Sequence, residues 1–322
     1  MKPFLLLAIR AEDAAADNEY EAFLACAGLR ECDLRRRRLE QRALGVLDLR
    51  DWSGIFLGGG PFNATDPGEL KSPVQRRVEA DLRGLFEKVI SADFPFLGAC
   101  YGIGTLGAHQ GATVDRRYAE PVGPVPVTLT REGRRDPLLS GLPATFDAFT
   151  GHKEAISVLP RHAVLLAESP ACPVQAFRIG SHVYATQFHP ELDATGLCTR
   201  IDVYKHAGYF EPGQAAELKA KAYRSNVTWP PAIVHQFVQR YTRGKHPSDA
   251  PAAAPAPSPG PTPVTDLDAA VPARAQIPGR SHQPAGGETS ENRHSGRNSS
   301  HDNTCKSPAN RHATAGDFGA PD

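Results

Sequence analysis

The chain has 322 residues, and its 36 basic and 36 acidic side chains give a formal net charge of zero. This balance argues against a protein devoted to binding nucleic acid or a membrane surface, and no segment approaches the ~20 apolar residues of a membrane span. The six cysteines form no C-x-x-C pair and the histidines complete no zinc-like spacing, which predicts reduced thiols in the cytoplasm and no metal or other cofactor.

Strand-like and helix-like segments alternate from the N-terminus, a pattern that predicts an α/β sheet. The expected elements are strands at 5–9 and 54–57, helices at 18–29 and 72–90, and a short strand or turn at 46–49. The first helix is expected to turn inward Tyr20, Phe23 and Leu24. The second begins with residue types typical of a cap and first turn, and its expected inward positions are Val74, Val78, Leu82, Leu85 and Val89. The basic run at 35–38 is expected to form a solvated rim between a helix and the next strand.

A glycine-rich segment, Gly-Gly-Gly-Pro at 58–61, follows the strand at 54–57. Glycines without side chains let backbone N–H groups approach a negatively charged oxygen. The same residues are also common punctuation at the end of a strand. Both interpretations stay open at this point.

Cys100 stands in Gly-Ala-Cys-Tyr-Gly at 98–102, directly after the apolar run at 94–97. Small residues two positions before and after it are typical of the tight strand-to-helix turn called a nucleophile elbow. That turn presents its central residue at a helix N-terminus, where unpaired N–H groups and the helix dipole favour a thiolate. The N–H of Tyr101 is placed to meet an oxyanion. The segment therefore predicts a catalytic cysteine.

A competing motif overlaps this segment, because residues 102–107 match G-x-G-x-x-G, the dinucleotide-binding pattern. The match lies far from the first strand and lacks a clear ribose-binding acid, since Glu120 precedes Pro-Val-Gly-Pro rather than ending a strand. We interpret these glycines as allowing the helix to pack closely on the sheet.

Short strand-like runs dominate from residue 125 onward, which suggests antiparallel additions to one edge of the sheet. The expected strands are 125–129, 155–158, 163–167, 174–178 and 183–186, followed by helices at 214–225 and 232–241. The predicted fold is thus a flavodoxin-like, doubly wound, mostly parallel sheet flanked by helices and extended by antiparallel edge strands.

The segment Gln-Phe-His-Pro-Glu at 187–191 follows the last of these strands. In an extended chain, His189 and Glu191 point the same way because they are two residues apart. A carboxylate beside an imidazole fixes its tautomer and stabilises the imidazolium formed when it takes a proton. Alone, the segment is more simply a surface turn. Together with Cys100, it predicts a nucleophile, a base and an orienting acid.

Four segments together carry a family resemblance: Gly-Gly-Pro at 59–61, Pro-Phe-Leu-Gly-Ala-Cys-Tyr-Gly at 95–102, Gly-His-Lys-Glu at 151–154 and Gln-Phe-His-Pro-Glu at 187–191. With them the chain resembles a class I, triad-type glutamine amidotransferase, most closely the stand-alone domains similar to the glutaminase part of GMP synthase. The resemblance implies that Cys100 attacks the side-chain amide of glutamine, with His189 as base and acid and Glu191 as its orienting partner. It implies Gly60 and Tyr101 as oxyanion donors.

Two departures from the family pattern bear on the substrate. The family usually places Gln four residues after the nucleophile, where it helps to hold the substrate, and this chain has Gly104 there. The family's Ser-His-x-Asp-like segment is altered to Gly-His-Lys-Glu. By the resemblance, Gly59, Gly151, His152 and Glu154 are expected substrate contacts. The glutamine pocket is either completed differently, or the substrate is not free glutamine.

Residues beyond 244 differ in composition from the rest. Pro, Ala, Gly, Ser, Asn and His dominate, and large aliphatic side chains are too few to bury a core. We expect an amidotransferase domain over 1–244 and a disordered tail over 245–322, to which no chemistry is assigned.

The leading function is a glutamine amidotransferase that hydrolyses L-glutamine and delivers ammonia to a separate synthase partner, because the sequence contains no ATP-binding G-x-x-x-x-G-K-[ST] loop. One alternative is a γ-glutamyl amide hydrolase with the same triad. Another is a non-catalytic regulatory subunit.

Overall fold

A nine-stranded sheet runs through residues 2–242, the part of the chain that the computed structural model describes. In spatial order its strands are β2 (Leu34–Arg38), β1 (Phe4–Ala8), β3 (Gly54–Leu57), β4 (Phe96–Ala99), β11 (Val183–Thr186), β10 (Ala176–Ile179), β9 (Val164–Glu168), β6 (Glu120–Leu129) and β7 (Thr145–His152). The first five pair in parallel and the remaining pairings are antiparallel. The expected α/β sheet with antiparallel additions at one edge is confirmed.

Strand β4 is the strand that positions the nucleophile, and it lies between β3 and β11. In the parallel pairing of β4 with β11, Ala99 lies opposite Thr186. The chain therefore leaves both strands at the same edge of the sheet, where Cys100 and Gln187 follow. Carboxyl ends of parallel strands are where α/β sheets usually build their ligand sites.

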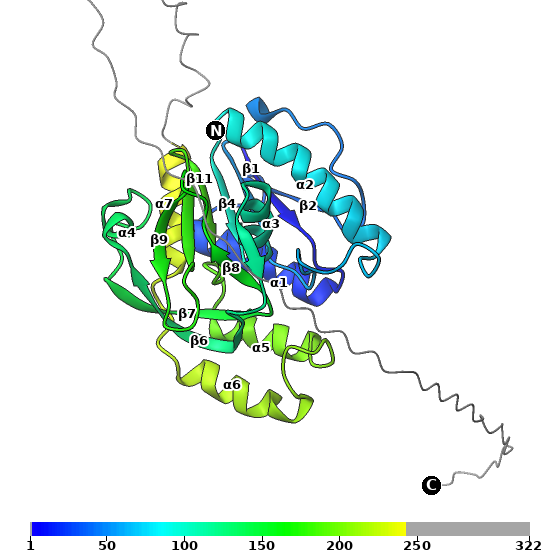
Figure 1. Cartoon of the computed structure of the whole chain (residues 1–322), viewed down its shortest axis with the longest axis vertical. Helices are drawn as coiled ribbons and strands as arrows, with labels where there is room; N and C mark the ends of the chain where they lie inside the picture. The colour runs from blue at the N-terminus through cyan, green and yellow to red at the C-terminus, as the bar shows by residue number, and fades with distance from the viewer. Residues whose placement is uncertain (1, 243–322) are drawn as a thin grey trace, which may run out of the picture. The chain divides into compact units, whose positions relative to one another are not determined.

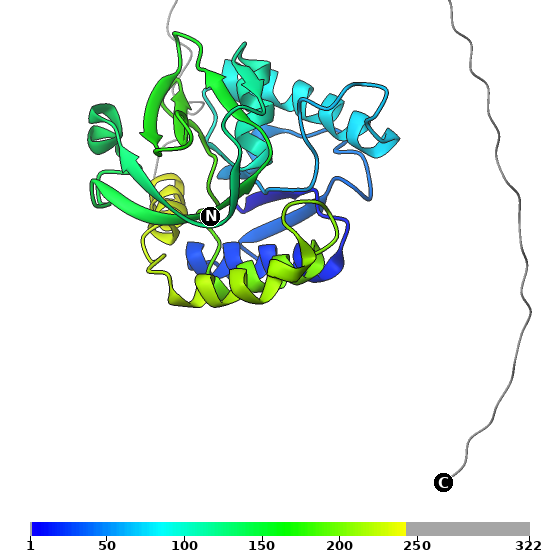
Figure 2. The same ribbon diagram turned by 60° about the horizontal axis from the view of Figure 1, so that its bottom comes forward.

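Helices cover both faces of the sheet (Figure 1). Helix α1 (Asp13–Ala27) and helix α7 (Pro231–Thr242) pack on one face, in a cluster that includes Phe4, Phe56 and Phe237. Helix α2 (Pro73–Ser91) and helix α3 (Tyr101–His109) pack on the other. Figure 2 shows α5 (Ala194–Val203) and α6 (Ala215–Arg224) on the same side as α1 and α7. The final helix thus packs on the core of its own chain.

The sequence pattern explains α2 in detail. The Ser72 hydroxyl accepts a hydrogen bond from the N–H of Gln75, and Pro73 occupies the first helical position, as expected for a cap and first turn. Four of the predicted inward positions are buried: Val78, Leu82, Leu85 and Val89. The fifth prediction is wrong, because Val74 lies in the first turn and is 36% exposed.

The basic run at 35–38 is a strand, not the loop-like rim that its charge suggested. It forms most of β2, an edge strand parallel to β1. Arg36 pairs with Asp17 and Arg38 with Asp13, both on α1. Leu34, at the start of the strand, is buried. The acids of the adjacent helix therefore let an edge strand tolerate consecutive arginines.

The antiparallel half differs from expectation at three places. Strand β6 begins five residues earlier than predicted and contains three prolines. It pairs with β9 only at Thr128 and Leu129. Its prolines therefore lie where few backbone donors are needed. Strand β7 was missed. The strand at 155–158 is confirmed as β8 (Ala155–Val158), but it pairs with β5 (Thr113–Asp115) in a separate two-stranded sheet.

The remaining elements are short. Helix α4 (Arg131–Arg135) connects β6 to β7, and the segment at 46–49 is a loop leading into a 3₁₀ turn, Leu49–Asp51. A second 3₁₀ turn, Pro212–Gln214, precedes α6. No helix within residues 2–242 is both long and apolar enough to cross a membrane. The predicted boundary at 244 and the tail at 245–322 lie outside the described residues.

Candidate active site

Cys100 occupies the junction between β4 and α3 in a backbone conformation that few residues adopt, with φ 53° and ψ −95°. Such a conformation is strained for any residue with a β-carbon. The N–H of Cys100 donates to the Thr186 carbonyl, 2.8 Å away, which ties the turn to β11. Of the two predicted small neighbours, Gly98 is closely packed, since a β-carbon there would lie 3.2 Å from the backbone of Gly102. The strand-to-helix elbow is therefore present.

His189 and Glu191 face each other in the segment that follows β11. Nδ1 of His189 lies 2.9 Å from Oε1 of Glu191, and both side chains are buried. The predicted imidazole–carboxylate pair is thus formed. Its pairing depends on a tight turn rather than on the extended chain assumed from the sequence, because the N–H of Leu192 donates to the carbonyl of His189.

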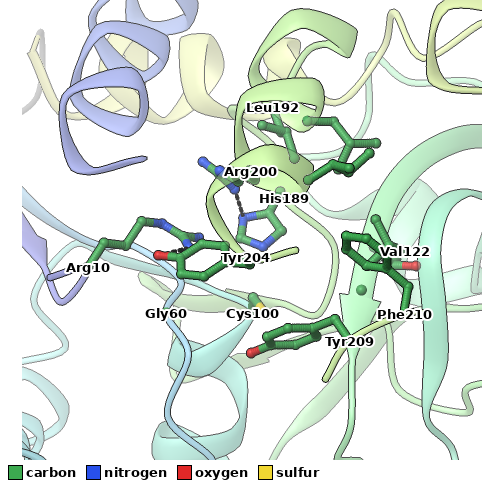
Figure 3. Close-up of a pocket in the computed structure, with 14 residues that line it drawn as sticks. Arg10, Gly60, Cys100, Val122, His189, Leu192, Arg200, Tyr204, Tyr209 and Phe210 are labelled. Carbon is green, nitrogen blue, oxygen red and sulfur yellow. Dashed lines mark hydrogen bonds between the residues drawn. The ribbon is translucent and has the colours of Figure 1, made fainter. Parts of the chain in front are cut away.

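A buried arginine from α5 completes this pair. Nη2 of Arg200 donates to Oε1 of Glu191 at 2.8 Å. Nη1 of Arg200 lies 2.9 Å from Nδ1 of His189, the contact that Figure 3 shows. A guanidinium can only donate. When His189 carries its proton on Nδ1, only Glu191 can accept it, and the contact with Arg200 disfavours a second proton on the ring.

A second buried arginine extends the network to the other side of the pocket. Nε of Arg10 donates to Oε1 of Glu19 at 3.0 Å, and Nη1 of Arg10 donates to the Tyr204 hydroxyl at 3.3 Å. Arg200 lies 3.8 Å from the same Glu19 oxygen. Arginines and glutamates thus alternate from Arg10 to Glu191. The sequence analysis missed Arg10, Glu19 and Arg200: Arg10 directly follows an apolar run, whereas Glu19 and Arg200 have polar neighbours in the sequence.

The glycine loop at 58–60 fits closely around this network. A β-carbon at Gly58 would lie 2.4 Å from the Glu19 carboxylate, and one at Gly59 would lie 2.5 Å from Cε1 of His189. At Gly60 it would lie 2.4 Å from Ile9. Within residues 2–242, neither the N–H of Gly60 nor that of Tyr101 donates to a protein acceptor. The triple glycine is therefore more than strand-end punctuation.

Burial dominates the protonation of the two reactive groups. It raises the pKa of the Cys100 thiol to about 11, although Arg10 and Arg200 favour the thiolate. Burial, reinforced by Arg200, lowers the pKa of His189 to about 4, although Glu191 favours the charged ring. Burial alone would raise the pKa of Glu191, but His189 and Arg200 outweigh it and hold that pKa well below its usual range. At neutral pH the site therefore holds a thiol beside a neutral imidazole.

Two pockets meet at Cys100. The larger, of about 510 Å³, contains Cys100, His189, Arg10 and Arg200 (Figure 3). The smaller, of about 330 Å³, contains Cys100, Tyr101, Gly104 and the segment 151–154. Gly60 and Gly151 line both pockets. The structure thus brings all nine residues predicted for the site to one region, with Gly59 packed against His189.

His152 and Glu154 serve the protein's own framework within the smaller pocket. Nδ1 of His152 lies 2.9 Å from the Glu154 carbonyl and Nε2 lies 2.9 Å from Glu120, so both ring nitrogens are engaged. Glu120 also accepts from Ser169 and Gln175. Cys172 lies beside Glu120 and His152, and the potential ligand atoms of these three residues are within 4.8 Å of one another. The hydrogen bonds already satisfy the carboxylate, so this group is a buried polar support for the loop.

The carboxylate of Glu154 holds a neighbouring loop. Its oxygens accept from the N–H of Ala64 at 2.6 Å, and from the N–H and hydroxyl of Thr65 at 2.9 and 2.6 Å. A β-carbon at Gly104 would lie 3.4 Å from Oε1 of Glu154. The departure at position 104 therefore coincides with an acidic side chain in the adjacent space.

The glycines of the G-x-G-x-x-G match have a packing role. A β-carbon at Gly107 would lie 2.5 Å from Cδ1 of Ile156 on β8, whereas one at Gly102 would make only ordinary contact with Leu57 on β3, at 3.5 Å. The first turn of α3 is also the turn that follows the Cys100 elbow. These contacts support the interpretation that the motif permits close helix packing.

Comparison with known proteins gives the family. The model of the glutamine amidotransferase class-I family matches residues 16–200. The chain belongs to the class-I glutamine amidotransferase family. Enzymes of this family act on the side-chain amide of glutamine. The matched residues include the elbow, the glycine loop and the His189 segment.

Individual relatives of this amidotransferase match part of the chain. The glutamine-hydrolyzing GMP synthase of Edwardsiella ictaluri is 29% identical over 155 residues, 46% of this chain and 27% of that protein. In Methanoculleus marisnigri, one of the subunits of a glutamine-hydrolyzing GMP synthase is 27% identical over 168 residues, 52% of this chain and 80% of that subunit. The chain thus spans about a quarter of the length of the first curated GMP synthases it matches.

Solved structures share the fold. A glutamine amidotransferase from Thermotoga maritima superposes with a TM-score of 0.61 at 22% identity, covering 76% of this chain and 100% of its own. One from Methylobacillus flagellatus gives 0.57 at 18% identity, with coverage of 75% and 94%. These likenesses confirm the mixed sheet flanked by helices.

Proposed function

We propose that this protein hydrolyses the side-chain amide of L-glutamine through a Cys100 thioester and releases ammonia. The observation that carries the proposal is the strained elbow, which presents Cys100 to the same pocket as His189 while Glu191 and Arg200 hold the other side of the imidazole. A nucleophile, a base and an orienting acid arranged in this way are the components of acyl transfer.

The protonation states dictate the order of events. Since the pKa of Cys100 is about 11 and that of His189 about 4, the resting pair is neutral. As the sulfur attacks the amide carbon, its proton passes to the imidazole, and Glu191 stabilises the imidazolium that forms. His189 then donates this proton to the leaving nitrogen, the C–N bond breaks, and ammonia departs. Water, deprotonated by His189, cleaves the thioester to glutamate.

The oxyanion formed in each half-reaction needs backbone donors. We assign this role to the N–H groups of Gly60 and Tyr101, which have no protein acceptor within the described residues and which flank Cys100 in the pocket lining. Loss of one such donor typically costs about 3–4 kcal/mol of transition-state stabilisation.

The amino-acid end of glutamine fits the smaller pocket. Gly151 and His152 form part of its wall. The carboxylate of Glu154, which lies beside Gly104, supplies negative charge for the ammonium group of the substrate. Gly59 contributes by leaving space for His189. In this arrangement Glu154 takes over part of the work that the family assigns to the Gln four residues after the nucleophile.

The ammonia acceptor is proposed to be a separate synthase. The relatives that share the matched region are named GMP synthases, one of them as a single subunit of such an enzyme, and this chain spans only about a quarter of the longer ones. We place the reaction in the cytoplasm, since a reduced Cys100 thiol is required for attack. A non-catalytic regulatory role is disfavoured because Cys100 and His189 line one pocket and Glu191 contacts the imidazole.

The test is glutamate release from L-glutamine by the purified protein, compared with Cys100→Ala. The matched control is Cys32→Ala, which removes an exposed cysteine remote from these segments. Turnover abolished only by Cys100→Ala supports the proposal. If the purified protein does not turn over glutamine because its partner is absent, a diazoketone analogue of glutamine should still alkylate Cys100, since such analogues react with a competent nucleophile. The absence of both turnover and labelling at Cys100 would contradict the proposal.

A further inference from the structure

The larger pocket lies on the side of Cys100 from which the amine must leave. His189 lines this pocket but not the smaller one, and it is the residue that would protonate the departing nitrogen. The glutamyl part of a substrate in the smaller pocket would therefore direct its nitrogen, and anything attached to that nitrogen, into the larger one.

The wall of this pocket is mainly apolar. Six side chains provide most of it, several of them shown with Cys100 in Figure 3: Val122, Leu192, Leu197, Ile201, Tyr204 and Phe210. Its two cations, Arg10 and Arg200, are already bonded to Glu19 and Glu191. A pocket with apolar walls and committed charges favours an uncharged apolar group.

The size of the pocket exceeds what ammonia requires. Its empty volume is about 510 Å³, part of which is open to solvent. Ammonia is similar in size to water, which takes about 30 Å³ in the liquid. The space therefore admits an amine that carries a substituent, part of which can extend toward solvent.

The segment that contains Ala207 and Tyr209 forms part of the pocket wall, and Lys153 contacts both residues. Lys153 donates from Nζ to the Ala207 carbonyl at 3.0 Å, and the same Nζ lies 4.4 Å from the centre of the Tyr209 ring. Tyr209 lines both pockets, as Figure 3 shows for the larger one. The aromatic wall is therefore anchored to the turn between β7 and β8.

We propose that the same site cleaves γ-glutamyl amides whose amine bears an aromatic or branched apolar group, with that group in the larger pocket. This inference rests on the proposed function. The Cys100 sulfur bonds to the γ-carbonyl carbon, the C–N bond breaks, and the nitrogen takes the proton that His189 received from the thiol. Water then hydrolyses the thioester, so that amide and water give glutamate and a free amine.

Hydrolysis is tested with γ-L-glutamylanilide and L-glutamine in parallel. We expect kcat/KM for the anilide to exceed that for glutamine by at least tenfold, with both activities abolished in Cys100→Ala. Val122→Trp, which fills the pocket, is expected to lower the ratio of anilide to glutamine kcat/KM at least tenfold. The matched control is Val158→Trp, at an exposed position on β8 outside the pocket lining, which leaves the ratio unchanged.

Binding is tested independently of turnover by calorimetry on Cys100→Ala. Burying a phenyl ring favours the anilide over glutamine by roughly tenfold or more, and Val122→Trp in the same background is expected to remove this advantage. Phe210→Ser removes part of the apolar wall, so it should also reduce the binding advantage of the anilide over glutamine.

Each combination of results decides the inference. Cys100-dependent glutamine hydrolysis with neither cleavage nor tighter binding of the anilide overturns it and leaves the proposed function standing. Tighter anilide binding that Val122→Trp removes, with neither turnover of either compound nor diazoketone labelling at Cys100, supports the pocket assignment and contradicts the proposed glutaminase. Equal binding of the two compounds, with neither turnover nor labelling at Cys100, overturns both.

Discussion

The carboxylate of Glu154 lies beside Gly104, with Oε1 3.4 Å from the position of a β-carbon there. Because the same carboxylate holds Ala64 and Thr65, Glu154→Ala should disorder one wall of the smaller pocket. We expect KM for glutamine to rise at least tenfold while kcat falls less. Steady-state kinetics would measure both. Thr65→Val, which removes only the hydroxyl donor, should have a smaller effect. An unchanged KM in Glu154→Ala would contradict this role.

Gly59 controls the position of the imidazole. In Gly59→Ala the new β-carbon would overlap Cε1 of His189, so the ring must move. We expect kcat/KM to fall about 100-fold, the size of effect that a displacement of ~1 Å can have. Gly84→Ala on α2 is the control, since its β-carbon meets nothing within 4 Å; it should retain activity and gain about 0.5–1 kcal/mol of stability. Full activity in Gly59→Ala would contradict this expectation, because it would show that the His189 ring can accommodate the added β-carbon.

The pH profile should report the depressed pKa of His189. Protonated imidazole cannot accept the thiol proton, so kcat/KM should fall as pH drops through about 4. Removing Arg200 removes a positive charge that disfavours protonation, so Arg200→Met should move this acidic limb to higher pH, by about one unit. Arg50→Met, at an exposed ion pair, should leave the limb in place. Stability must be followed at each pH by circular dichroism.

Glu191 both orients His189 and neutralises Arg200. Glu191→Gln should lower kcat by a factor of about 10⁴, as loss of the orienting carboxylate does in serine proteases. It should also lower the free energy of unfolding by about 3–5 kcal/mol, because Arg200 remains buried without its partner. Urea denaturation would measure this loss. Adding Arg200→Met should restore part of the stability; strictly additive losses would argue against direct pairing.

Alkylation should reveal the resting state of the thiol. With a pKa of about 11, Cys100 should react with iodoacetamide slowly at pH 7 and faster as pH rises. Peptide mass spectrometry can follow it separately from exposed Cys32, and burial raises the pKa of Cys26 to about 12, which keeps that thiol slow. Fast, pH-independent alkylation at Cys100 would instead indicate a preformed thiolate–imidazolium pair.

The sequence was most informative where local geometry and chemistry coincide. The elbow requires small residues around Cys100, and the apolar strand before it is equally clear, so both could be predicted. Arg200 could not, because α5 has weak helical signals: Gly196 lies within it, and its main start signal is the Asp193 cap. Strand β7 was missed since its first and third residues, Thr145 and Asp147, are polar and its apolar alternation is short.

Long-range partners account for the other differences. The charge of the run at 35–38 indicated a solvated rim between a helix and the next strand, whereas the run forms a strand in which Arg36 and Arg38 pair with acids of α1. Likewise, nothing local to Glu154 indicates that it would hold Ala64, because the two meet through tertiary packing.

The order of strands in the sheet also sets an order of events during synthesis. Strand β4, which leads into Cys100, ends at Ala99, whereas its neighbour β11 begins at Val183 and is followed by His189. While the ribosome is still making the intervening residues, one edge of β4 has no strand to pair with, and the nucleophile has no base. A nascent chain therefore carries its reactive cysteine for a long stretch of translation before the fold can make use of it.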